Sequence, residues 1–137
     1  DVCSSDLILG EIYASDDCAF HTPEFHSAFQ PSLAIVGASG VLIGNSTHNT
    51  LDLFSHRAEE ATFLKQLLKG IPEVIIAVDN SKIGRRHPWS FGGSVLAGKI
   101  VRLITDTLTP EQQPHLKDLP ERLKSQGIDF SFLTAQP

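Results

Sequence analysis

Short apolar runs alternate along the chain with longer segments in which apolar residues recur at helical spacing. The apolar runs predict five strands, at residues 6–10, 32–38, 73–78, 99–105 and 129–133. The second and third runs are almost continuously apolar, which is typical of strands covered on both faces of a parallel sheet. Strands that alternate with helices in this way indicate βαβ units and a mainly parallel sheet.

Two helices are expected between these strands. Apolar residues at i, i+3, i+6 and i+7 place one stripe on a helix from near residue 55 to residue 69, namely Ala61, Leu64, Leu67 and Leu68. Gly70, with a proline two residues later, is expected to end that helix. The second helix is expected to begin at Asp118 as its N-cap, with Glu121 at N3, and to end at Gly127.

Composition bounds the fold class and some functions. With 137 residues, of which 41% are hydrophobic and 20% charged, the chain suits one globular α/β domain. The net charge of -5 argues against binding of nucleic acid by this segment itself, because phosphate binding needs a basic face. No apolar run approaches the roughly 18 residues of a membrane span, and no signal peptide opens the chain, so no membrane partner is expected.

The first seven residues are expected to be non-native. The sequence contains no methionine, and residues 2–7 (VCSSDL) resemble a translated frame of a sequencing adaptor. Residues 8–137 are then expected to form one partial domain of a longer protein. This interpretation leaves Cys18 as the one native cysteine, which cannot form an internal disulfide, and a reducing cytoplasm is the expected location.

A glycine-rich segment follows the second predicted strand. Ligands in open α/β sheets bind at the carboxyl ends of the strands, and residues 37–40 (GASG) lie at such an end. Two glycines permit a sharp turn close to an anion, and Ser39 adds a hydroxyl group. Taken singly, GASG is more often a tight strand-to-helix turn. It is neither a Walker A motif nor a complete G-x-G-x-x-G, so nucleotide binding is disfavoured.

A polar cluster, DNSKIGRR at residues 79–86, follows the third predicted strand. Asp79 precedes Lys82 by three residues, and an acid beside a lysine holds the ammonium in place and keeps it protonated, as recognition of a phosphate or a sugar hydroxyl requires. The alternative is a solvated loop charge. Lys65 projects from the first predicted helix, where the alternative is a surface charge paired with a neighbouring glutamate.

Four histidines in the first half of the chain raise the question of a metal site: His21, His26, His48 and His56. Their spacings give neither the i, i+4 pair nor the His-x-His pair that a preorganised site favours. We therefore expect neither a metal nor a cofactor. His48, in the polar segment after GASG, is the histidine expected to approach a sugar, with an exposed loop residue as the alternative.

Taken together, these segments resemble the effector-binding domain of the DeoR family of bacterial transcriptional repressors. The resemblance runs from about residue 7 to residue 133, and its most specific part is D-x-S-K-x-G at residues 79–84, followed by I-T-D at residues 104–106. It implies a Rossmann-like three-layer α/β domain with a mainly parallel sheet. Ribose-5-phosphate isomerases, glucosamine-phosphate deaminases and CoA transferases are similar in fold to this family.

The resemblance also implies a function and a set of ligand-binding residues. Domains of this family follow a winged helix-turn-helix and sense phosphorylated sugars or related metabolites, so DNA would be contacted only through an upstream domain. The full-length protein is expected to be a homo-oligomer, as is usual for repressors that bind palindromic sites. Carried over by motif position, the residues expected to contact the ligand are Gly37, Ser39, Gly40, Lys65, Asp79, Ser81 and Lys82.

Some positions depart from the family pattern, and a second function class stays open. Residues 10–11 are Gly-Glu instead of a glycine pair, Gln66 replaces a basic residue, and residues 43–57 form a longer connection. The alternative is an isomerase-like or deaminase-like enzyme, which needs a carboxylate base near the substrate carbon. GASG has Ser39 at the position where such an enzyme would need a carboxylate. Asp79 is expected to hold its own turn together. We therefore favour a non-catalytic sensor.

Overall fold

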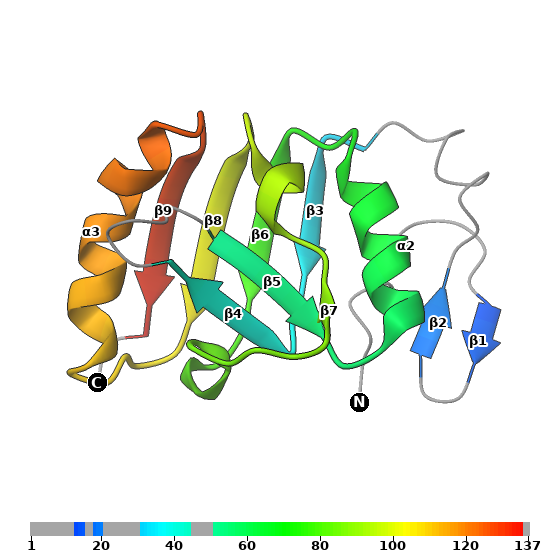
Figure 1. The fold of residues 1–137 in the computed structure, drawn as a ribbon, viewed down its shortest axis with the longest axis horizontal. Coiled ribbons are helices and arrows are strands. Elements are labelled where there is room, and N and C mark those ends of the chain that lie inside the picture. Colours follow the sequence, from blue (N-terminus) through cyan, green and yellow to red (C-terminus); the bar gives the residue numbers. More distant parts are fainter. Residues whose placement is uncertain (1–12, 16–17, 21–30, 45–50, 136–137) are drawn as a thin grey trace.

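A computed structural model describes residues 13–15, 18–20, 31–44 and 51–135. Its centre is a four-stranded parallel sheet with the strand order β3-β6-β8-β9 (Figure 1). The strands are β3 (Leu33–Val36), β6 (Glu73–Ala77), β8 (Ile100–Thr105) and β9 (Asp129–Thr134). The apolar runs therefore predicted these four strands closely, and the domain is α/β as expected. The fifth predicted strand, at residues 6–10, lies outside the described residues.

Two antiparallel sheets complete the described strands. One has the order β4-β5-β7, with β4 (Gly40–Ile43), β5 (Leu51–Ser55) and β7 (Trp89–Ser90). The other pairs β1 (Tyr13–Ser15) with β2 (Cys18–Phe20). The sequence pattern did not predict the three-stranded sheet. Because GASG leads from β3 directly into β4, the expected strand-to-helix turn at this point is wrong.

Helix α2 (Ala58–Leu68) follows the prediction. The predicted apolar stripe is buried, together with Phe63. Glu59 and Glu60 occupy the first turn, where negative charge complements the helix dipole. The helix ends at Leu68, just before Gly70, and two short 3-10 helices, η2 (Asn80–Lys82) and η3 (Gly93–Leu96), lie farther along the chain.

Helix α3 (Gln112–Lys124) begins earlier than the sequence interpretation placed it. Thr109 Oγ1 accepts a hydrogen bond from the Gln112 backbone N–H at 3.3 Å, and Gln112 Oε1 accepts one from the Thr109 N–H at 3.0 Å. This reciprocal pair is a capping box, and Pro110 directly after the threonine suits the first helical position. The expected start at Asp118 is therefore wrong, because an upstream cap already satisfies the first N–H groups and Asp118 lies inside the helix.

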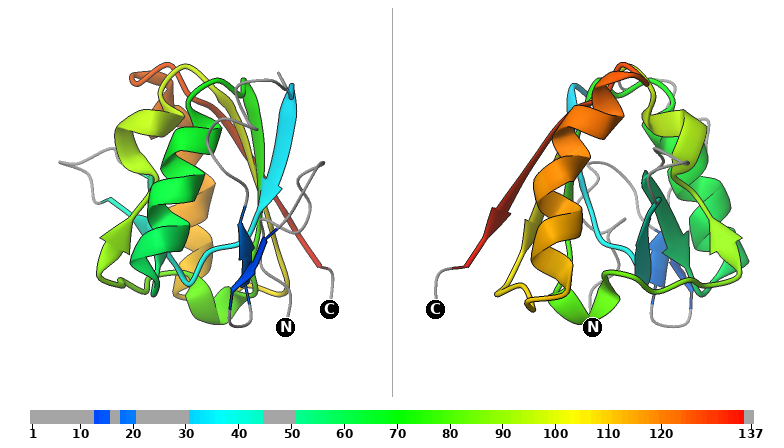
Figure 2. Two further views of the ribbon diagram at one scale, coloured as in Figure 1. Left: turned by 90° about the vertical axis from the view of Figure 1, so that its right-hand side faces the viewer. Right: turned by 60° about the vertical axis from the view of Figure 1, so that its left-hand side comes forward.

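Both helices and the three-stranded sheet pack on the same face of the parallel sheet (Figure 2). Side chains of Val36, Ile76 and Leu103 form one inward row across adjacent strands, and they share a single buried cluster with residues of β4, β5, α2 and α3. The opposite face is open among the described residues and exposes Leu33, Ile35, Ile104 and Leu133. The expected coverage on both faces is thus not seen within these residues.

Within the described part of the chain, no helix is long and apolar enough to cross a membrane.

Candidate functional site

Three loops meet at the carboxyl edge of the parallel sheet, where β3, β6 and β8 end side by side (Figure 1). A Cβ added to Gly37, after β3, would lie 3.8 Å from the carbonyl oxygen of Ala77. The Val78 N–H, after β6, donates to the Ile104 carbonyl oxygen at 3.0 Å. The two polar clusters recognised in the sequence are therefore neighbours, at the edge where open α/β sheets bind ligands.

The Asp79 carboxylate holds together the turn that follows β6. It accepts the Ser81 backbone N–H at 2.9 Å and the Ser81 hydroxyl, and it lies 3.5 Å from Lys82 Nζ. The hydrogen bond from the Ser81 hydroxyl is the largest of the effects that hold the pKa of Asp79 below its ordinary value, and the Lys82 charge adds to it. Asp79 therefore stays ionised at neutral pH and keeps the Lys82 ammonium, whose side chain is 34% exposed, at this edge.

Asn80 ties the same turn to the segment that follows β8. Its backbone N–H donates to Asp106 Oδ1 at 2.7 Å, and its side-chain amide donates to the Thr107 carbonyl oxygen. Its own carbonyl oxygen accepts from Gln112 Nε2 at 2.9 Å. The D-x-S-K-x-G and I-T-D motifs are thus in direct contact. Sequence reasoning recognised both motifs but missed Asn80 and Asp106 as the residues that join them.

The GASG segment packs against the chain that follows Lys82. Gly84 donates its N–H to the Val41 carbonyl oxygen at 2.7 Å, and its φ of 91° lies in the left-handed region that favours glycine. A Cβ on Gly40 would lie 2.5 Å from the Arg85 carbonyl oxygen. Gly40 is therefore required by the close approach of two loops, and it is buried beneath one of them.

Ser39 forms hydrogen bonds through both its backbone and its side chain. Its N–H donates to the Phe54 carbonyl oxygen of β5 at 2.8 Å, and its hydroxyl shares a 2.9 Å hydrogen bond with His56 Nδ1. The buried Ser55 fixes the chain next to this histidine, because its hydroxyl donates to Glu60 and accepts the Arg57 N–H. Sequence reasoning considered His56 only as a metal ligand and missed its position beside Ser39.

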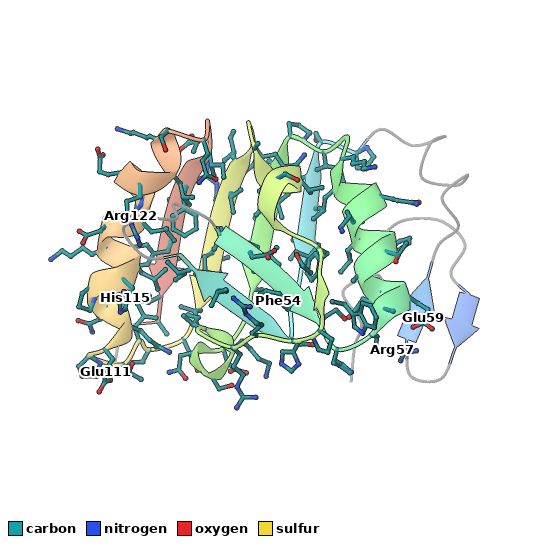
Figure 3. All side chains as sticks on the ribbon, in the orientation of Figure 1. Phe54, Arg57, Glu59, Glu111, His115 and Arg122 are labelled. Carbon is teal, nitrogen blue, oxygen red and sulfur yellow. The ribbon has the colours of Figure 1, made fainter. Side chains whose placement is uncertain are left out.

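Lys65 does not join this cluster. Helix α2 begins at the carboxyl edge, where Arg57 and Glu59 mark its start (Figure 3). Lys65 follows Ala58 by about 10 Å along the helix axis, at 1.5 Å per residue. Its exposed side chain instead lines a hollow with Trp89 of β7. Neither Ser39 nor Lys82 lines the hollow to which Lys65 contributes.

The carboxyl edge offers hydroxyl, imidazole and cationic groups to a ligand. Arg85 and Arg86 follow Lys82 and are exposed, and no ion pair links either arginine to another residue of the described ranges. Ser39 and His56 lie next to Gly40, on which the Arg85 backbone packs. Such a set suits an anion that also carries hydroxyl groups.

No group of three His, Cys, Asp or Glu side chains among the described residues is arranged to hold a metal ion. His21, His26 and His48 lie outside those residues, as does the segment in which His48 was expected to approach a sugar. A scan against protein-family models finds no match, and a search of curated proteins finds none either. The resemblance to a known family therefore rests on the sequence motifs alone.

Proposed function

We propose that the chain is an effector-binding domain of the DeoR family and that the carboxyl edge of its parallel sheet binds a phosphorylated sugar or a related metabolite. The observation that carries this proposal is the contact between the two most specific motifs. Asn80 of the first motif donates to Asp106 of the second, and Gly84 of the first donates to Val41, next to GASG. Three motifs that are far apart in the sequence thus lie together at the carboxyl edge of the parallel sheet.

The chemistry of the edge supports a phosphate ester as the ligand. Lys82 is held by an ionised Asp79, and a positioned ammonium donates charge-assisted hydrogen bonds to phosphate oxygens. Ser39, with its partner His56, supplies a hydroxyl and an imidazole that suit sugar hydroxyl groups. Arg85 and Arg86 add positive charge that attracts an anion to the edge.

The open face of the sheet supports the three-layer fold shared with ribose-5-phosphate isomerases and CoA transferases. In a three-layer α/β domain, helices cover both faces of a parallel sheet. The open face carries Leu33, Ile35, Ile104 and Leu133, which form the apolar surface that such a layer would cover. In the full-length protein, we propose that ligand binding changes the hold of a winged helix-turn-helix on DNA, in a homo-oligomer.

The carboxylates at this edge favour a sensor over a sugar isomerase or deaminase. An isomerase needs a base whose pKa is raised toward neutral pH. The pKa of Asp79 is lowered, chiefly by the Ser81 hydroxyl, and Asp79 and Asp106 both accept backbone N–H groups that shape the loops. These carboxylates act as structural acceptors.

A thermal-shift titration with a panel of sugar phosphates, ribose 5-phosphate among them, tests the proposal. A ligand that binds only the native state stabilises it by about 2.7 kcal/mol at a hundred times its Kd. Lys82→Ala removes a charge-assisted hydrogen bond, so we expect Kd to rise about tenfold or more while the apo Tm changes little.

Lys124→Ala is the matched control. Lys124 forms the same kind of i,i+3 ion pair, with Glu121 at 3.2 Å, on the last turn of α3. We expect this variant to bind the sugar phosphate as the wild type does. If a member of the panel stabilises the wild type and Lys82→Ala equally, Lys82 is a solvated loop charge and the ligand site lies elsewhere.

A further inference from the structure

The hollow that Lys65 lines, of about 300 Å³, runs along α2 beside β7. Its lining combines an indole ring with two ammonium groups, from Trp89, Lys65 and Lys69, and the hydroxyls of Thr62 and Ser90 also contribute. The volume lies at the small end of the range of about 300 to 1,000 Å³ for small-molecule sites. None of the residues at the Asp79 turn lines this hollow.

The backbone of Trp89 is held in place by the strand on which it lies. Trp89 pairs with Ser55 in the antiparallel β5-β7 ladder, and the neighbouring Ser90 hydroxyl donates to Asp52 Oδ1 at 2.7 Å. Even so, Trp89 is 47% exposed, although large aromatic side chains are favoured in cores. A paired strand thus presents a partly exposed aromatic ring to the hollow.

The two lysines stand one helical turn apart on the same side of α2. Both are exposed, and neither forms an ion pair with a carboxylate in the part of the chain that the structure describes. Like charges at i and i+4 repel by a few tenths of a kcal/mol. The negative end of the helix dipole at the C-terminus of α2 offsets that repulsion. The dipole therefore explains the two lysines at this position, but it does not explain the exposed indole beside them.

We propose that this hollow binds a small planar aromatic anion, of the chemistry that a nucleoside monophosphate presents. The ring of the ligand stacks on Trp89, because offset stacking between aromatic faces is favourable. Its phosphate binds the ammonium groups of Lys65 and Lys69, which act as point charges toward phosphate oxygens. The net charge of -5 disfavours a longer polyanion such as a single-stranded nucleic acid in the same place.

Trp89 is the one tryptophan of the chain, so selectively excited tryptophan fluorescence reports on this hollow directly. With the full chain, we expect adenosine monophosphate to quench Trp89 saturably. Adenosine lacks the phosphate and ribose 5-phosphate lacks the ring, so each should bind at least about tenfold more weakly. Lys65→Ala and Lys69→Ala should each raise the Kd for adenosine monophosphate about tenfold.

Four variants locate the ligand. Lys82→Ala and Lys124→Ala should leave the Kd for adenosine monophosphate unchanged, which separates this hollow from the sugar-phosphate edge. Trp89→Phe, measured by calorimetry, should retain binding because it keeps a ring, and Trp89→Ala should lose it. The proposal would be overturned if Lys65→Ala and Trp89→Ala both bound adenosine monophosphate undiminished, or if this binding required Lys82. It would also be overturned if ribose 5-phosphate quenched Trp89 with the same affinity, or if a thymidine oligonucleotide bound much more tightly.

Discussion

The two faces of the parallel sheet differ, although the same strands supply both. Side chains of one row, Ala34, Val74, Val101 and Phe130, point toward the helices and are buried. The next row along the strands consists of Ile35, Ile75, Arg102 and Ser131, and it points to the open face. There the Arg102 guanidinium contacts Glu73 at 3.2 Å and Ser131 at 3.1 Å, so the open face mixes apolar and charged groups.

This difference shows that an apolar run in the sequence does not by itself mean that both faces of the strand are buried. The runs in β3 and β6 are nearly continuous, yet their side chains alternate between buried and more exposed positions in the described structure. An apolar side chain on the outer face gains little from folding unless another layer covers it. The following predictions test whether the two faces contribute as differently to stability as their burial indicates.

The largest effect is expected from Leu103→Ala on the covered face. Leu103 is 0% exposed, and its truncation leaves a cavity, so the free energy of unfolding should fall by about 3 kcal/mol. The matched control is Ile104→Ala, one residue later on the open face, where the side chain is 40% exposed and the loss should be about 1 kcal/mol or less. Urea unfolding measures both, and equal losses would mean that the open face is covered in solution.

A smaller effect is expected at the start of α3, which belongs to the covering layer. Thr109→Ala removes the side chain that caps this helix and should lower the free energy of unfolding by about 1 kcal/mol. Thr107→Ala is the control, because Thr107 is exposed and accepts the Asn80 amide hydrogen bond with its backbone oxygen. Chemical denaturation of both variants decides the point. If Thr109→Ala lowers the free energy of unfolding no more than Thr107→Ala does, the capping box does not stabilise this helix.

The smallest effect is expected from the ion pair on the open face. Glu73 and Arg102 side chains are 33% and 49% exposed, and ion pairs of this kind contribute about 0 to 1 kcal/mol. A double-mutant cycle with Glu73→Gln and Arg102→Met should give a coupling energy in that range, and the coupling should shrink as salt rises. A larger, salt-insensitive coupling would indicate that the pair is shielded from water.

Local patterns predicted the elements that depend on local sequence. The apolar runs identified four parallel strands, and the stripe ending in Leu67 and Leu68 identified α2. The start of α3 was missed although its signal was present, since Thr109 and Gln112 have the spacing of a capping box. Asp118 has a residue type that is common at N-caps, so the sequence pattern predicted it as the cap, although it lies inside the helix.

Other features depend on contacts between residues far apart in the sequence, and a local sequence pattern carries no information about such contacts. Strand β7 has two residues and exists because it pairs with β5. The contact of Ser39 with His56 requires the β4-β5 ladder, which places the Phe54 carbonyl oxygen opposite the Ser39 N–H. From the sequence, Gly40 was interpreted as part of an anion-binding loop. The structure shows that glycine is needed there because the Arg85 backbone packs against it.

One side chain links the proposed ligand edge to a helix of the covering layer. The Gln112 amide accepts the Thr109 N–H that completes the cap of α3, and it donates to the Asn80 carbonyl oxygen in the turn that carries Lys82. A displacement of that turn therefore pulls on the first residues of α3, and a loosened helix start releases the turn. The Gln112 amide is therefore a direct mechanical link between the turn that carries Lys82 and the start of α3.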